Sequence, residues 1–129
     1  MISICKKNME NIFVDVNVLM DILGDRKFGF EEILDKKTIT VSALSFHILM
    51  YIMKLKVPNS KLNKYRKSCL IVALNKKVIK DAMIGPSVDF EDNVQLHSAV
   101  VGNCDYFLTL DKKLLKMKYF GKMKIGDKL

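Results

Sequence analysis

Three aspartates are placed where an α/β chain can bring reactive groups together. Asp15 directly follows the apolar residues 12–14, Asp111 comes shortly after the apolar residues 106–108, and Asp92 lies at an expected helix start. Carboxylates brought close together repel one another, and a divalent cation relieves that repulsion. Mg²⁺ and Mn²⁺ prefer such oxygen ligands, and a metal held by them can activate water and stabilise charge on a phosphate. The residue types and their placement therefore allow metal-dependent chemistry at a phosphate.

Each of these aspartates also has a purely structural interpretation. Asp15 and Asp111 could each cap the helix that follows, as Asp89 could cap the helix that contains Asp92. Asp92 could simply place a negative charge in a first helical turn, where the helix dipole favours it. A capping role and a metal-binding role can coexist in one side chain, so both interpretations stay open.

The pattern of apolar runs and breaker residues predicts strands that alternate with helices. Strands are expected at residues 11–14, 38–41, 69–74 and 106–108, with a further edge strand at 123–125. Helices are expected at 16–23 and 28–34, from Ser42 or Ser45 to about 56, from Asn59 or Ser60, at 78–83, from the Asp89 cap through 94–101, and from Asp111. Such an alternation forms a mostly parallel sheet covered on both faces. Ligands of these sheets bind beyond the carboxyl ends of the strands, where Asp15 and Asp111 fall.

Size and composition narrow the class of protein. With 129 residues, of which half are hydrophobic, we expect one domain spanning residues 1–129 with a buried core. The apolar runs are interrupted too often to cross a membrane, and the charged pair in "MISICKKNMEN" is not typical of a secretory signal. Cys5, Cys69 and Cys104 lack the spacing of a metal site, so we expect reduced, mostly buried thiols in a cytoplasmic protein.

The net charge is strongly positive. The formal charge of +8 comes mainly from lysine, and it favours a polyanionic partner such as RNA or an acidic protein segment. Lysine-rich and isoleucine-rich usage also follows from base composition, so the charge alone does not identify the partner. The basic residues are spread along the chain, which predicts no single basic arm.

Four segments resemble the PIN-domain family. "FVDVNVLMDIL" resembles the family's first strand with its Asp-x-Asn pattern, and "TVSALSFHILMYIMK" its second strand and next helix. "DFEDNVQLHSAV" is similar to the family's "DFEDALQ" helix start, and "CDYFLTLDKKL" to its "ADYIVTRD" strand and turn. These segments occur in the family's order and cover the chain from Asn11 to about Phe120. The resemblance implies a three-layer α/β/α sandwich with a mostly parallel central sheet of four to five strands.

The resemblance also implies an activity and its residues. The implied protein is a metal-dependent ribonuclease, similar to the toxin of a VapBC-type toxin–antitoxin pair, which forms a homodimer and is masked by a small antitoxin protein. In this sequence Asp15, Asp92 and Asp111 would hold Mg²⁺ or Mn²⁺ and carry catalysis. Three further side chains would support them: Asn17 by ordering the first loop, Thr109 by orienting Asp111 or a phosphate, and Asp89 as a further acid at the rim or only as a helix cap.

One position departs from the family's pattern. Toxin members commonly place a glutamate in the helix after the second strand, and the aligned residue here is Ile48, or His47 if the register shifts by one. A missing negative ligand lowers the expected metal affinity. The second functional hypothesis is therefore a PIN-like domain with an impaired nuclease site that binds RNA or a protein partner. A receiver-type phosphoacceptor ranks last, because it needs paired acids after the first strand and "FVDVNV" has one.

Overall fold

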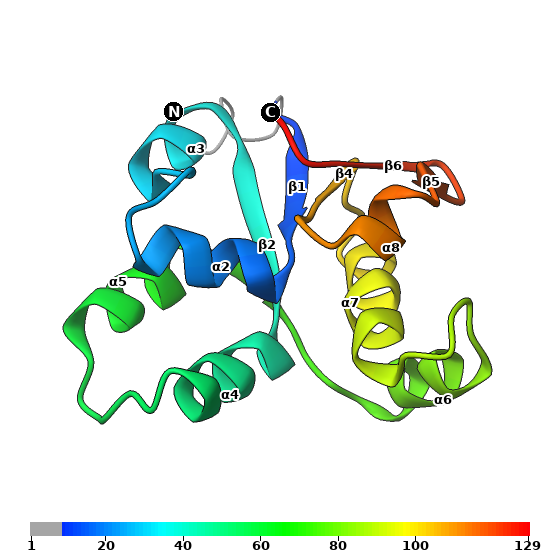
Figure 1. Ribbon diagram of the computed structural model, residues 1–129, viewed down its shortest axis with the longest axis horizontal. Coiled ribbons are helices and arrows are strands. Elements are labelled where there is room, and N and C mark those ends of the chain that lie inside the picture. The colour runs from blue at the N-terminus through cyan, green and yellow to red at the C-terminus, as the bar shows by residue number, and fades with distance from the viewer. Residues whose placement is uncertain (1–8) are drawn as a thin grey trace.

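The computed structural model describes residues 9–129 and confirms an α/β architecture around a mostly parallel sheet (Figure 1). The strands are β1 (Asn11–Val14), β2 (Thr38–Ser42), β3 (Leu70–Val72), β4 (Tyr106–Leu108), β5 (Tyr119–Phe120) and β6 (Met123–Gly126). Their order in the sheet is β3-β2-β1-β4-β6-β5. The sheet thus has six strands, which corrects the expected four to five.

The central position of β1 explains its composition. β1 pairs in parallel with β2 on one side and β4 on the other, so Ile12, Phe13 and Val14 are fully buried. Parallel neighbours are joined by crossover segments, and these crossovers place helices on both faces of the sheet. Because β1 and β4 run in the same direction, the residues after Val14 and Leu108 emerge at the same edge.

The helices divide into two layers, one on each face of the sheet (Figure 1). The first layer contains α2 (Val16–Leu23), α3 (Phe30–Lys36), α4 (Ala43–Ile52) and α5 (Ser60–Ser68). The second contains α7 (Phe90–Val101) and α8 (Lys112–Leu115), with α6 (Lys76–Ile84) packed against α7. This three-layer arrangement agrees with the PIN-like sandwich that the sequence resemblance implies.

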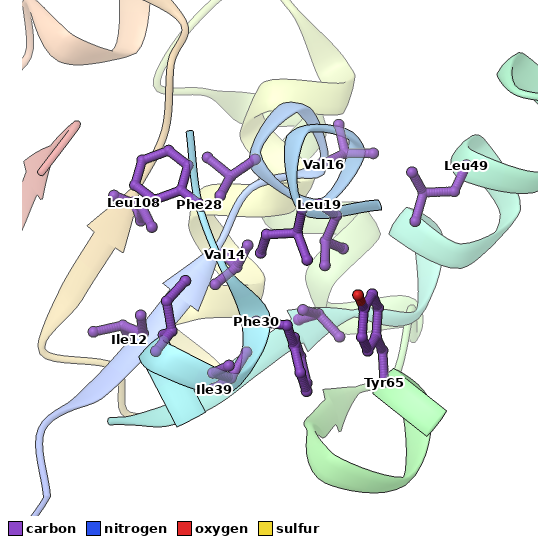
Figure 2. Close-up of a cluster of buried hydrophobic side chains, with 14 of the residues drawn as sticks. Ile12, Val14, Val16, Leu19, Phe28, Phe30, Ile39, Leu49, Tyr65 and Leu108 are labelled. Atoms are coloured by element: carbon purple, nitrogen blue, oxygen red, sulfur yellow. The ribbon is translucent and has the colours of Figure 1, made fainter. Parts of the chain in front are cut away.

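The alternation of side chains along β1 supplies both cores. Ile12 and Val14 point into the larger cluster under α2 to α5, which Figure 2 shows with Leu19, Phe30 and Tyr65 among its members. Phe13 points to the opposite face, where its ring stacks on Phe107 of β4 with centroids 5.2 Å apart. The strand that ends at Asp15 is therefore fixed from both sides.

The helix expected at 28–34 is shifted to Phe30–Lys36, and three other predicted elements differ more from the structure. The segment 69–74 forms a three-residue strand at the outer edge of the sheet, so Leu70 is exposed rather than buried. The segment 123–125 does not form the edge, because the two-residue β5 pairs antiparallel with β6 outside it. The helix after Ser42 ends at Ile52 rather than near residue 56, because Lys54 turns the chain with a φ of 50°.

Both cysteines in the described part of the chain are free thiols, as expected. Cys104 is buried and Cys69 half-buried, and burial raises their thiol pKa values to about 11 and about 12. Cys5 and the N-terminal segment with its charged pair lie outside the described residues. Within residues 9–129, none of the helices has the length and apolar character needed to span a membrane.

Candidate metal centre

Asp15 joins the end of β1 to the start of α2. Its Oδ1 accepts a hydrogen bond from the backbone N–H of Val16 at 2.8 Å, so it caps α2 as the structural interpretation predicted. Its Oδ2 accepts a hydrogen bond from the hydroxyl of Thr109 at 2.7 Å and a longer one from Asn17 Nδ2 at 3.3 Å. Asp15 is only 2% exposed, although its carboxylate forms no ion pair with any side chain of residues 9–129.

Thr109 connects the end of β4 to the same carboxylate. Its hydroxyl donates to Asp15 and accepts from the backbone N–H of Asp111 at 3.0 Å. Asn17 closes the network from the other side, because its Oδ1 accepts from the backbone N–H of Leu110 at 3.2 Å. Asp111 itself caps α8 by accepting from the backbone N–H of Lys113. The expected supporting roles of Asn17 and Thr109 thus have matching contacts, and Thr109 orients Asp15 as well as the backbone at Asp111.

Asp92 and Asp89 reach this edge from α7. Asp89 is the N-cap of α7, and its carboxylate accepts from the backbone N–H of Asp92 at 3.1 Å. Asp92 is half-buried one residue after the exposed Glu91. Burial raises the pKa of Glu91, with a further contribution from the charge of Asp89. Two acids therefore surround Asp92 at the start of one helix.

Burial, with a smaller contribution from mutual repulsion, raises the pKa values of two of these carboxyl groups. Burial raises the pKa of Asp15 to about 7, and the charges of Asp92 and Asp111 add to the rise, while hydrogen bonds from Thr109 and Val16 oppose it. Burial likewise raises the pKa of Asp92 to about 6, with Asp89 and Asp111 contributing. Among residues 9–129, the four ion pairs involve none of these acids. Within these residues the acids therefore form no ion pair, although the charge of Lys113 partly opposes the rise in the pKa of Asp92.

The donor chemistry fits a divalent cation, but the ligand set is not closed. Hard carboxylate oxygens without cationic partners are the ligands that Mg²⁺ and Mn²⁺ prefer. In the part of the chain that the structure describes, however, no three His, Cys, Asp or Glu side chains converge closely enough to hold one ion. The structure brings Asp15, Asn17, Thr109 and Asp111 into one hydrogen-bonded network, and it links Asp92 to that network through charge alone.

The position of the missing glutamate belongs to the hydrophobic core. Ile48 is 9% exposed and packs within the larger core cluster from α4, whereas His47 is exposed. Neither supplies a carboxylate. At this position of α4 the chain therefore has a buried apolar side chain where the toxin pattern has an acid.

A buried polar contact across the site was not predicted from the sequence. Ser45 Oγ of α4 donates to Gln95 Oε1 of α7 at 3.3 Å, and both side chains are fully buried. Gln95 Nε2 and the buried Ser98 Oγ have no hydrogen-bond partner in residues 9–129. Gln95 follows Asp92 by three residues and so lies on the same side of the helix. This spacing was the only sequence signal that could have indicated Gln95.

Comparisons with known proteins support the fold. Neither a family model nor a curated protein matches the sequence. A chain of VapBC2 from Rickettsia felis, solved bound to a DNA fragment from its promoter, has a similar structure, with a TM-score of 0.65 and 16% sequence identity. The similarity covers 90% of this chain and 97% of that one. At this identity the likeness concerns the fold alone, and it agrees with the PIN-like α/β sandwich described above.

Proposed function

We propose that this protein is a metal-dependent ribonuclease of the VapC type, the toxin of a toxin–antitoxin pair. The observation that carries the proposal is the buried carboxylate of Asp15 at the end of the central strand, which forms no ion pair within the described part of the chain. Its pKa responds to Asp92 and Asp111, so the three acids of the family's pattern lie in one electrostatic neighbourhood. The structural likeness to a VapBC2 chain adds a toxin–antitoxin context.

Asp15, Asp92 and Asp111 would hold the Mg²⁺ or Mn²⁺ ion. The ion, when bound, supplies the polarisation of water and the stabilisation of phosphate charge that phosphodiester hydrolysis needs. Thr109 and Asn17 hold the Asp15 carboxylate in one orientation through their hydrogen bonds. Since the pKa of Asp15 is about 7, this carboxyl group must give up a proton before it can act as a ligand near neutral pH.

The orienting role of Thr109 gives a testable consequence. Thr109→Val keeps the shape of the side chain but removes the hydroxyl that bonds Asp15 and the backbone of Asp111. Loss of such a supporting contact typically weakens metal binding by about 10- to 100-fold, and we expect about tenfold for Mn²⁺ by calorimetry. Thr38→Val, at the opposite end of the sheet, is the matched control and should leave the affinity unchanged. Equal affinities for the two variants would refute the role of Thr109.

The activity itself is tested with single-stranded RNA. The purified wild-type protein should cleave the RNA in the presence of Mn²⁺, and excess chelator should stop this cleavage. The Asp15→Asn variant should not cleave the RNA. Asp35→Asn removes one negative charge from the exposed side of α3 and should cleave like the wild type. Cleavage that persists in chelator, or that survives Asp15→Asn, would rule out the proposed metal centre.

The antitoxin is the proposed protein partner, and a groove between α4 and α5 suits it. The groove has a volume of about 780 Å³ and is lined mainly by apolar atoms, with Arg66 at its border. The side chains that give it this character include Phe46, Met50 and Leu62. An amphipathic helix binds such a groove through its apolar face, and an acidic residue beside that face would pair with Arg66.

A second candidate function is a nuclease-impaired domain that binds RNA or a protein without turnover. Ile48 favours it, because this residue places a buried apolar side chain where the toxin pattern has a ligand. It predicts that no divalent metal supports cleavage, although Asp15→Asn binds RNA as the wild type does.

Restoring the acid separates the two candidates. If the site is a metal centre that lacks one ligand, Ile48→Glu should strengthen Mn²⁺ binding by about tenfold or more, since second-acid ligands contribute charge directly. Ile48→Glu should also lower the free energy of unfolding by about 3 kcal/mol, because a carboxylate enters a buried position. Ile48→Gln is the neutral control and should cost stability without strengthening binding. Metal affinity that is equal in both variants would show that position 48 is not adjacent to a metal centre.

A further inference from the structure

The positive charge of the chain is concentrated near its C-terminus. Residues 112–128 contain seven lysines and one acid, Asp127, for a net charge of +6 out of the total of +8. The remaining residues contain 15 basic and 13 acidic side chains, which leaves only +2. The expectation that the basic residues are evenly spread is therefore wrong for this end of the chain.

Five of these lysines lie within residues 112–122, which we call the lysine segment. The segment contains no acid, and all five lysines are exposed: Lys112, Lys113, Lys116, Lys118 and Lys122. It forms α8, β5 and the turns around them at one side of the molecule (Figure 1). Leu114 is buried in the second core cluster, the one that contains Phe13 and Phe107, and it fixes α8 to the sheet. The lysines of α8 therefore face outward.

The lysine segment begins directly at the candidate metal centre. Asp111 is the N-cap of α8, so Lys112 is the next residue after a proposed metal ligand. The backbone N–H of Lys113 donates a hydrogen bond to Asp111 Oδ1 at 2.9 Å, so this residue also lies beside that proposed ligand. Among residues 9–129 the lysines that form ion pairs are Lys37, Lys61, Lys64 and Lys77, and none belongs to the segment. Its charges are therefore free for a partner.

Protection of the sheet edge explains only part of this charge. Lysines on an outer strand prevent edge-to-edge association, and β5 is the outermost strand on this side. Lys112, Lys113 and Lys116 lie on or just after a helix, however, where no strand edge needs protection. The charges of these three lysines remain unexplained by that role.

We propose that the lysine segment binds the phosphate backbone of single-stranded RNA and guides it to the carboxylates at Asp15 and Asp111. This inference rests on the proposed ribonuclease function. The acids alone repel a polyanion, so a substrate needs positive charge beside them, and free lysines release counterions when they contact phosphates. Tyr119 of β5 is 57% exposed within the segment and offers a ring on which a base can stack.

The test compares two triple variants that lose the same charge. Lys112→Gln/Lys113→Gln/Lys116→Gln alters α8, and the control Lys36→Gln/Lys56→Gln/Lys67→Gln alters exposed, unpaired lysines of the opposite layer. Binding of fluorescent polyuridine RNA is measured in chelator over a salt series. The α8 variant should bind about tenfold more weakly, with the salt slope reduced by about 2, since each lost phosphate contact removes about 0.7. The control should change binding less than about twofold.

Further measurements separate this inference from folding effects and from the proposed function. Lys→Arg at the same three positions keeps the charge and should retain RNA binding, and unchanged thermal melting would exclude misfolding. Equal losses in the α8 variant and the control, or no loss in either, would overturn the inference. So would an α8 variant that keeps RNA binding but loses binding of a polyglutamate peptide, since the surface would then serve a protein partner. If the α8 variant loses RNA binding while the wild type never cleaves, the inference stands and the ribonuclease proposal fails.

Discussion

Replacing Asp15 by asparagine is expected to stabilise the metal-free protein while abolishing its binding of Mn²⁺. Asp15 is 2% exposed and is repelled by Asp92 and Asp111, and its pKa of about 7 lies well above the ordinary aspartate value of 3.8. A shift of about three pH units corresponds to roughly 4 kcal/mol of destabilisation when the group is ionised. Part of this gain is lost because asparagine cannot accept both the Val16 and Thr109 hydrogen bonds through oxygen, so we expect about 2 kcal/mol near neutral pH.

The pH dependence of stability follows from the same shift. The folded protein holds the Asp15 proton up to a pH of about 7, whereas the unfolded chain loses it near 3.8. Between these values the folded state binds more protons, so the free energy of unfolding of the wild type falls as pH rises, and it levels off above about 7. The pKa of Asp92 is also raised, to about 6, so this residue likewise makes the free energy of unfolding fall as pH rises. Urea unfolding across this range should show a smaller fall for Asp15→Asn than for the wild type.

A matched control distinguishes this effect from a general change in net charge. Asp35→Asn also removes one negative charge, but from an exposed position on α3, and its stability should follow that of the wild type at every pH. An Asp15→Asn variant that is less stable than the wild type near neutral pH would mean that capping of α2 outweighs the repulsion among the acids.

Phe107→Ala is expected to lower the free energy of unfolding by about 3–5 kcal/mol, which is typical of a buried aromatic ring removed from a core. Phe107 is fully buried on β4 and stacks on Phe13 of β1, with 11° between the ring planes. These two rings lie just before Thr109 and Asp15 along their strands, so the same variant should also weaken metal binding by loosening the two strand ends. Urea unfolding and Mn²⁺ calorimetry measure the two effects.

The control for this prediction is an apolar residue without packing. Val88 is fully exposed in the loop before α7, and Val88→Ala should change stability by less than about 0.5 kcal/mol. A loss below about 1 kcal/mol in Phe107→Ala would contradict the account, because it would mean that the second core cluster does not hold β4 against β1.

The features that sequence reasoning predicted are governed by local chemistry. The run 12–14 indicated the central strand because a strand buried on both faces is typically apolar at every position. The aspartates at positions 15, 89 and 111 precede helices, and each does cap the helix that follows it. A side chain that reaches its own next turn depends on few residues, so its sequence signal is direct.

The features that were missed depend on distant parts of the chain. The run "CLIVAL" is as apolar as a buried strand, and only the strand order shows that β3 lies at an edge with Leu70 exposed. The two residues of β5 are too few to produce an alternating pattern. The Ser45–Gln95 contact joins residues 50 positions apart, and no local rule predicts it. The distances among the carboxylates of Asp15, Asp92 and Asp111 likewise depend on how the side chains pack, so no local rule predicts them.

The central claim, a metal centre built on Asp15, is tested most directly by calorimetric titration of the wild-type protein with Mn²⁺ at several pH values. We expect one ion to bind per chain above pH 7, with release of protons on binding. The affinity should fall as the pH drops below about 7, because the metal must displace the Asp15 proton. Asp15→Asn should show no binding under the same conditions. The absence of Mn²⁺ binding by the wild type above this pH, or binding that is equal in Asp15→Asn, would contradict the account.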